Sequence, residues 1–407
     1  MSDVLVIGAG PAGAVAAAIL ARRGHEVLVL ERQRFPRFSI GESLLAATTQ
    51  ILDEAGMLDA VLAAGFQFKN GATFVRGEQY SEFNFADKTA AGRSFTFQVK
   101  RAEFDQILAR EAARHGADVR HEVEIVSFAL EGDQPAVGAR TAGGDIEIHR
   151  PRFVLDASGF GRTLPRLLDL EKPSSFPVRS ALFGHVRDAI AAGTFDRQKI
   201  RIGVHPTKAD VWSWLIPFPD GTSSVGIVAA REHHERFRGS PAERLRAMIA
   251  DEPRLDELIG AAVPTRPAGE IVGYAANVKA LHGPGFALLG NAAEVLDPVF
   301  SSGVTIALHS AKLAALALDR QLRGESVDWE RDFAAPLGFG IATFRTFVNA
   351  WYDGSLIDII FFPEKDPTIH RLICSILAGY AWDPKNPYTG PGSARRLGAL
   401  AALCRAA

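Results

Sequence analysis

Two tryptophans and a proline are gathered in mid-chain, where residues 212–217 read Trp-Ser-Trp-Leu-Ile-Pro. Residues two positions apart on a β-strand lie on the same face, so Trp212 and Trp214 would present both indoles to one side. Beside a reactive cofactor, such a bulky wall would decide which molecules reach the reactive group. A strand with aromatic core residues has the same pattern, and the motif alone does not separate the two interpretations.

The N-terminus supplies a candidate cofactor site. A short apolar run at residues 3–7 is followed by Gly-x-Gly-x-x-Gly at 8–13, an alanine-rich stretch at 14–23 that reads as a helix, a second apolar run at 26–30 and Glu31. In a strand–turn–helix unit, Gly8 permits the tight turn, Gly10 lets the backbone approach a pyrophosphate and Gly13 lets helix and strand pack closely. The helix N-terminus would face the phosphates, and Glu31 would accept hydrogen bonds from a ribose diol. This order of elements predicts a bound dinucleotide. The unit alone does not show whether that dinucleotide is FAD or NAD.

Two further strand ends carry residues suited to a cofactor. Residues 156–159 read Asp-Ala-Ser-Gly, and small residues are needed where backbone approaches a bound group, although an ordinary strand exit looks the same. Residues 290–298 also follow an apolar run and precede a helix, so they could bond a ribityl hydroxyl and face the pyrimidine end of a flavin. Residues 301–303, Ser-Ser-Gly, would offer backbone N–H groups to an anion, although a helix cap has the same composition.

Composition narrows the class of protein. With 407 residues the chain can bury a large core and form two domains, and its net charge of −2 gives no electrostatic case for nucleic acid. Cys374 and Cys404 are the only cysteines, which allows no disulfide framework and no cysteine-based metal site, and suits a reducing cytoplasm. The run at residues 4–7 is too short for a signal peptide, and no apolar run reaches the about 18 residues of a membrane span. We therefore expect a cytoplasmic protein without a metal, a nucleic-acid partner or a membrane span.

The periodicity of apolar residues predicts the elements that position these motifs. It predicts helices at residues 44–58, 102–115, 241–259 and 304–323, and strands at residues 72–75, 83–85, 95–99, 178–186, 199–204, 211–217 and 223–229. We predict an α/β (α+β) fold, in which a Rossmann-like FAD-binding domain is interrupted by a mostly antiparallel β-sheet substrate domain and followed by a helical C-terminal region. The predicted FAD-binding domain comprises residues 1–65, 98–165 and 266–325, the substrate domain residues 66–97 and 166–265, and the helical region residues 326–407.

Five motifs occur together in a specific order: the glycine motif, Gly-Glu-Ser-Leu-Leu at 41–45, Lys-x-Gly-x-x-Phe at 69–74, the tryptophan motif, and Asp-Pro-Val-Phe-Ser-Ser-Gly at 297–303. Each motif alone is modest. Together, over roughly residues 1–310, they resemble the FAD-dependent halogenases, within the wider para-hydroxybenzoate-hydroxylase-like flavoprotein fold. The C-terminal third is similar to the shorter halogenase subgroup through Trp351-Tyr352 and residues 378–380.

The resemblance implies a reaction that uses FAD, O2 and a halide. A separate flavin reductase would supply FADH2, because no second Gly-x-Gly-x-x-Gly follows a strand to hold NAD(P)H. Chloride or bromide would then be oxidised to hypohalous acid, which a lysine directs onto an electron-rich aromatic carbon. That lysine matches Lys69, for which a solvated surface lysine is the alternative, while Trp212 and Trp214 would keep the organic substrate from the flavin.

The resemblance also assigns binding residues. The halide and substrate would lie near Phe300, Ser301, Ser302 and Gly303. The residues predicted to bind FAD are Gly8, Gly10, Pro11, Ala12, Gly13, Glu31, Arg32, Glu42, Ser43, Arg101, Asp156, Gly159, Gly290, Asn291, Asp297, Pro298, Ser302 and Gly303.

The sequence departs from the tryptophan halogenases in ways that bear on the substrate. Those enzymes carry a glutamate in the loop before Ser-Thr-Gly, where this chain has Phe300, and an aromatic residue where this chain has Val295. The chain is also shorter. Free tryptophan is therefore not expected as the substrate, and Phe300 matches the subgroup that acts on phenolic or pyrrolic groups tethered to carrier proteins.

Other flavoproteins stay open as alternatives. Gly-Glu-Ser-Leu-Leu also occurs in geranylgeranyl-reductase-like flavoproteins, whose mid-chain motif is similar, so an FAD reductase or dehydrogenase is the main alternative. A flavin monooxygenase and a catalytically silent flavin-binding protein are the others.

Overall fold

The predicted strand–turn–helix–strand unit is present in the computed structural model, which describes residues 2–174 and 176–406. Strands β1 (Val4–Ile7) and β2 (Val27–Glu31) pair in parallel, joined by helix α1 (Pro11–Ala21). The helix begins at Pro11, three residues before the alanine-rich stretch that the sequence suggested, because proline suits the first helical turn. The glycine motif therefore belongs partly to the helix.

This unit lies at the centre of a six-stranded sheet with the order β20-β21-β11-β1-β2-β7. Its other members are β7 (Asp118–His121), β11 (Phe153–Asp156), β20 (His282–Gly283) and β21 (Phe286–Leu288), and all pairings are parallel except that of β20. Helix α1 packs against α4 (Arg101–Arg114) and α9 (Ser302–Leu322). On the opposite face, Leu5 and Ile7 pack against a small sheet formed by β8 (Glu124–Glu131), β9 (Gln134–Arg140) and β10 (Ile146–His149).

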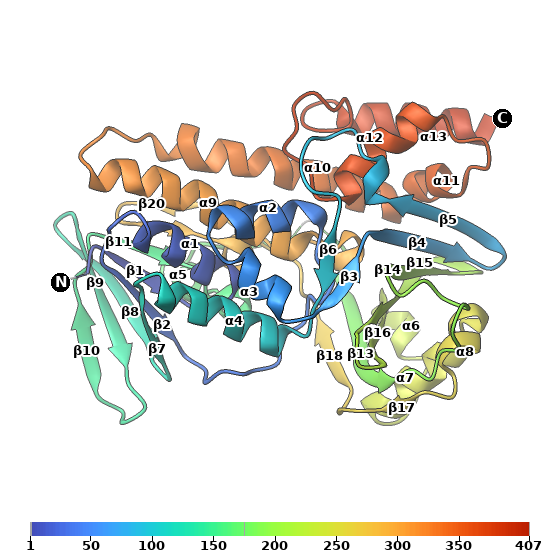
Figure 1. Cartoon of the computed structure of the whole chain (residues 1–407), viewed down its shortest axis with the longest axis horizontal. Helices are drawn as coiled ribbons and strands as arrows, with labels where there is room; N and C mark the ends of the chain where they lie inside the picture. Colours follow the sequence, from blue (N-terminus) through green and yellow to red (C-terminus); the bar gives the residue numbers. More distant parts are fainter. Residues whose placement is uncertain (1, 175, 407) are drawn as a thin grey trace.

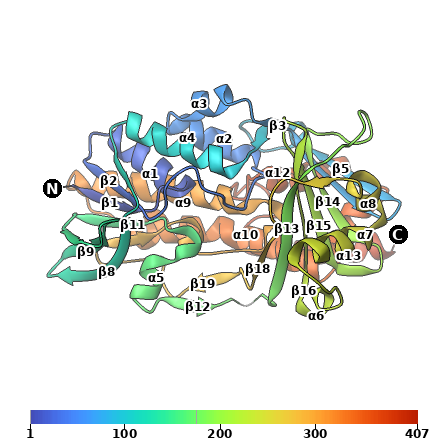
Figure 2. The ribbon, with the colours of Figure 1, turned by 90° about the horizontal axis from the view of Figure 1, so that it is seen from below.

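A second, eight-stranded sheet forms the other end of the molecule (Figures 1 and 2). Its main path is β17-β13-β16-β15-β14-β4-β5, with β18 also paired to β13, and only β4 and β14 pair in parallel. The strands are β4 (Gly71–Arg76), β5 (Gln79–Asn84), β13 (Arg179–Arg187), β14 (Lys199–His205), β15 (Lys208–Pro217), β16 (Thr222–Ala230), β17 (Val263–Pro264) and β18 (Gly269–Val272). Helices α7 (Pro241–Ala250) and α8 (Pro253–Ile259) cover one face. The predicted combination of a parallel and a mostly antiparallel sheet is confirmed.

Three local features differ from the sequence-based expectation. The helix predicted at 44–58, with its end near Gly56, is α2 (Ala46–Glu54), and an unpredicted helix, α3 (Leu58–Ala63), follows the turn at Gly56, which has φ +73°. Strand β3 (Gln67–Lys69) pairs with β6 (Thr96–Gln98) in a separate two-stranded sheet. Strand β18 adds to the eight-stranded sheet, although residues 266–325 were assigned to the FAD-binding domain. We therefore propose that this boundary lies after β18.

The C-terminal region is helical, with α10 (Ala335–Tyr352), α11 (Ser355–Phe361), α12 (Pro367–Leu377) and α13 (Ser393–Ala406). Helix α10 packs on α9, and α11 and α12 pack on β5, so this region shares the main hydrophobic core (Figure 1). Within the described residues, no helix is long and apolar enough to cross a membrane.

Candidate active site

A cavity of about 630 Å³ lies where the carboxyl ends of the parallel strands face the eight-stranded sheet. In open α/β sheets, ligands bind at this edge because loops and helix N-termini converge there. Seventeen of the predicted site residues line the cavity: Gly8, Gly10, Pro11, Ala12, Glu31, Arg32, Glu42, Ser43, Arg101, Gly159, Trp212, Trp214, Gly290, Asn291, Pro298, Ser301 and Gly303. The predicted residues outside the wall are Gly13, Lys69, Asp156, Asp297, Phe300 and Ser302.

The turn before α1 is shaped for a close approach of backbone and ligand. Gly8 has φ +94°, and a Cβ at Gly13 would lie 1.9 Å from the carbonyl oxygen of Gly8. Only glycine therefore lets the turn pack against the helix. The N-cap of α1 is Gly10, and no side chain caps this helix end. Free N–H groups at a helix N-terminus attract phosphate, so the turn fits the pyrophosphate of FAD.

Glu31 lies at the end of β2, almost fully buried on the cavity wall. One of its carboxylate oxygens accepts the N–H of Ala9 and the other the N–H of Gln33, each at 2.9 Å. These bonds fix the carboxylate beside the glycine turn, where its remaining lone pairs can accept hydrogen bonds from a ribose diol.

Arg37 is a cavity residue that the sequence analysis missed. Its Nη1 donates to Asp105 at 2.7 Å, and Asp105 also accepts two hydrogen bonds from Arg101. Arg101 in turn donates to the carbonyl of Ile40. The Arg37 guanidinium lies 3.5 Å from the position of a Cβ on Gly10, so it adds positive charge beside the predicted pyrophosphate site. Only the position of Arg37 shortly after β2 could have suggested this role.

Two predicted cofactor ligands shape loops and do not face the cavity. Asp156 accepts the N–H groups of Ser158 and Leu164, and burial raises the pKa of its carboxyl. Asp297 accepts the N–H of Val299 and the hydroxyls of Tyr274 and Tyr352, and burial also raises its pKa. Since these carboxylates are occupied by the protein, direct FAD binding by Asp156 or Asp297 stays a prediction without support from their contacts.

The tryptophans form the expected wall on β15. Trp212 and Trp214 both line the cavity, their ring centroids are 5.9 Å apart, and they are only 2% and 5% exposed. A Cβ at the cross-strand residue Gly226 would lie 2.3 Å from the Trp214 ring, so this glycine makes room for the indole. Trp212 donates its indole N–H to the hydroxyl of Tyr352, at the end of α10. The orientation of the wall therefore depends on the C-terminal region.

Residues at the N-terminus of α9 line the cavity. Ser301 is the N-cap of α9 and adopts a left-handed conformation with φ +55°. No side chain caps the N-terminus of α9. Ser301 and Gly303 line the cavity, whereas Ser302 does not. This helix end would attract an anion.

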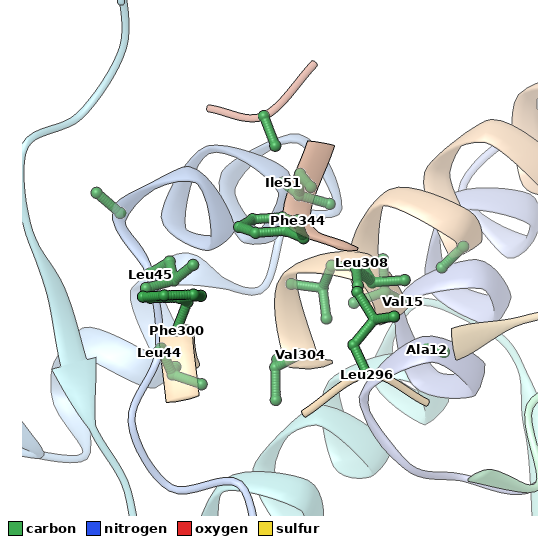
Figure 3. Packing of buried hydrophobic residues seen from close by; sticks show 14 of the residues in the cluster. Ala12, Val15, Leu44, Leu45, Ile51, Leu296, Phe300, Val304, Leu308 and Phe344 are labelled. Carbon is green, nitrogen blue, oxygen red and sulfur yellow. The ribbon is translucent and has the colours of Figure 1, made fainter. Parts of the chain in front are cut away.

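Phe300 points away from the cavity wall. Its ring meets the rings of Phe347 and Trp351 edge-on, at centroid distances of 6.3 and 5.8 Å. Figure 3 shows Phe300 among the buried side chains of the main core, which also includes Leu44 and Leu45. Contact between Phe300 and an organic substrate stays a prediction.

Lys69 is not a surface residue, because its side chain is only 1% exposed. Its Nζ donates to the Ser43 hydroxyl at 2.8 Å and to the Leu44 carbonyl at 2.7 Å, and it lies 5.4 Å from the centre of the Phe85 ring. No carboxylate is paired with it among the described residues. Burial therefore lowers the pKa of the Lys69 ammonium to about 7.

This buried amine has a measurable effect on stability. An unfolded lysine keeps its ordinary pKa near 10.5, so the folded protein binds fewer protons than the unfolded chain between pH 7 and pH 10.5. The free energy of unfolding of the wild type, relative to Lys69→Met, should therefore rise by about 3 kcal/mol from pH 7 to pH 9.5. Urea denaturation of both proteins checks this, and parallel pH profiles would contradict a lowered pKa.

Comparisons with known proteins place the chain among FAD-binding proteins. The profile of the FAD binding domain family matches residues 1–332. A tryptophan 2-halogenase of Chondromyces crocatus is 34% identical over 80% of this chain, which spans only 62% of that relative's length. A brominase of 1H-pyrrole-2-carbonyl-(peptidyl-carrier protein) from Pseudoalteromonas luteoviolacea is 30% identical, covering 82% of this chain and 80% of that protein. The crystal structure of a flavoprotein/dehydrogenase from Cytophaga hutchinsonii is 44% identical with a TM-score of 0.96, covering 100% of this chain and 99% of that chain.

Proposed function

Because the chain belongs to the FAD binding domain family and its relatives include halogenases, we propose that this FAD-dependent oxidoreductase halogenates an electron-rich aromatic substrate. The proposed co-substrates are FADH2, O2 and chloride or bromide. The net reaction joins FADH2, O2, a halide ion, a proton and an aromatic C–H group to give FAD, two waters and a carbon–halogen bond.

The observation that carries the proposal is the environment of Lys69. A buried lysine whose pKa is lowered to about 7 touches Ser43, which lines the same cavity as the two tryptophans. A large fraction of such a lysine is a neutral amine near neutral pH, and a neutral amine can act as a nucleophile or accept a proton. A purely structural lysine would more commonly pair with a carboxylate.

Each part of the cavity has a proposed task. FADH2, when bound, would supply two of the four electrons that reduce O2 to water, and the halide would supply the other two. The backbone at Ser301 and Gly303 attracts the halide, and Trp212 and Trp214 exclude the organic substrate from the flavin side. The Lys69 amine, which contacts the cavity wall at Ser43, directs the oxidised halogen to carbon through that residue.

The proposed partners follow from the same reasoning. A separate reductase supplies FADH2, since we recognise no second dinucleotide motif in the sequence. The substrate is a phenolic or pyrrolic group, including one tethered to a carrier protein, because the brominase from Pseudoalteromonas luteoviolacea acts on such a substrate. The absence of a glutamate at position 300 argues against free tryptophan.

A second candidate is an FAD-dependent reductase or dehydrogenase. Two observations favour it. The 44% identical protein is described as a flavoprotein/dehydrogenase, and the Lys69 side chain does not line the cavity. In that case the flavin would exchange a hydride with a substrate in the cavity, and Lys69 would have a structural role.

Product mass separates the two candidates. The protein would be supplied with a flavin reductase, bromide and a panel of free and carrier-loaded phenolic and pyrrolic acids. The halogenase predicts a product with the isotope doublet of bromine. A change of two mass units with no bromine would select the reductase or dehydrogenase.

The tryptophan wall yields a separate prediction. Trp212→Phe and Trp214→Phe keep an aromatic ring but shrink the wall, so both should bind FAD while a smaller share of the consumed O2 ends in halogenated product. Full truncation to alanine is less informative, since it would cost about 3–5 kcal/mol of stability. The matched control is Trp382→Phe, whose indole contacts His309 and the Pro336 carbonyl and lies outside the cavity wall. An unchanged product-to-oxygen ratio in both wall variants would make the tryptophans simple core residues.

A further inference from the structure

The amine of Lys69 reaches the cavity only through another residue. Lys69 is absent from the cavity wall, and the partners of its Nζ in the described structure are Ser43, Leu44 and Phe85. Of these three, Ser43 alone lines the cavity. Ser43 therefore contacts the lysine through its hydroxyl and also belongs to the cavity wall.

The local backbone fixes this arrangement. The segment around Ser43 runs beside β6, where Ser43 pairs with Gln98 and the N–H of Leu44 bonds the carbonyl of Phe97. Lys69 lies on the other edge of β6, opposite Thr96. The long lysine side chain thus extends across β6 to Ser43, and two strand pairings hold both residues in place.

The hydrogen bonds allow a proton to pass in either direction. When Lys69 is an ammonium, Ser43 accepts one of its N–H groups, and the serine O–H is free to donate into the cavity. When Lys69 is a neutral amine, its lone pair can accept the serine O–H, and the serine oxygen can take a proton from the cavity. Both states are populated near neutral pH, because burial lowers the lysine pKa to about 7.

We propose that Ser43 is the positioning residue through which Lys69 exchanges protons with an oxygen acid in the cavity, such as water or hypohalous acid. As the acid gives its proton to the Ser43 oxygen, the serine gives its own proton to the Lys69 amine, and the reverse transfer restores both groups. This proposal rests on the proposed halogenation, but the coupling of Ser43 to Lys69 can be tested without turnover.

The first test measures the lysine itself. NMR titration of protein carrying 13C at the lysine ε-carbons gives the pKa of Lys69, with the signal assigned by its loss in Lys69→Met. Ser43→Ala removes an acceptor from the ammonium, so the pKa should fall, whereas Ser43→Thr should keep it near the wild-type value. The control Thr49→Val removes another buried hydroxyl, which bonds the carbonyls of Ala46 and Phe95, and should leave the pKa unchanged. An unchanged pKa in Ser43→Ala would overturn the coupling.

The second test measures the relay. With product formation normalised to bound FAD, Ser43→Ala should form halogenated product about 100-fold more slowly, and the lysine inflection should be lost from its pH profile. Ser43→Thr should restore both. Normal product formation per bound FAD in Ser43→Ala, or retention of the lysine inflection in its pH profile, would overturn the proposal. If the wild type forms no halogenated product, the proposed function fails, while the titration still decides whether Ser43 and Lys69 are coupled.

Discussion

Lys69→Met should lose carbon–halogen bond formation by about 100-fold or more while it still binds FAD and consumes O2. Methionine has a similar length and no charge, so it fits the buried site beside Phe85 but has no basic amine to accept or return a proton. Oxygen consumption should continue, because the amine does not line the cavity where FAD is expected.

Lys69→Arg should fail as completely. A guanidinium is larger than an ammonium and stays protonated at any pH at which the protein is folded, so it cannot supply the neutral amine. Oxygen uptake and halogenated product would be measured in parallel, with FAD content as the control for folding. Full halogenation by Lys69→Met would remove the lysine from the mechanism, and loss of FAD from that variant would recast it as structural.

Gly13→Val should abolish FAD binding. The new Cβ would lie 1.9 Å from the Gly8 carbonyl oxygen and 3.2 Å from the Cβ of Ala157, so the turn would have to move away from the position that a pyrophosphate requires. The matched control is Gly338→Val on α10, where a Cβ would meet nothing within 4 Å. Flavin absorbance after addition of FAD and desalting is the measurement.

Circular dichroism and a thermal melt show whether the variant is folded. If Gly13→Val does not fold, Gly13→Ala adds a single methyl at the same position and keeps the test available. A variant that binds FAD in the wild-type ratio would mean that the glycine turn does not hold the cofactor.

Features that depend on neighbouring residues were predictable from the sequence. The glycine turn, the position of Glu31 at the end of β2 and the shared face of Trp212 and Trp214 all follow from local spacing, and the structure has each of them. The start of α1 was misplaced because glycines read as a turn, although here Gly10 is the N-cap of the helix and Pro11 occupies its first position.

Features that depend on distant residues were not predictable. Asp297 lies in the motif expected to face the flavin, yet its carboxylate holds Tyr274 and Tyr352, and Tyr352 is 55 residues away. Lys69 is buried because it pairs with Thr96 of β6 and packs against Phe85. Neither contact can be inferred from the sequence around a single lysine in a short strand. Strand β18 was assigned to the FAD-binding part because only its pairing with β13 places it in the other sheet.

The oxygen requirement of substrate conversion tests the central claim most directly. Enzyme with chemically reduced FAD, bromide and an aromatic substrate would be kept strictly free of O2 and then exposed to a known amount of O2. Halogenation predicts no conversion before O2 is admitted and, after it, at most one bromine incorporated into product for each O2 consumed. Conversion of the substrate by reduced FAD in the absence of O2 would contradict the account and identify the protein as a reductase.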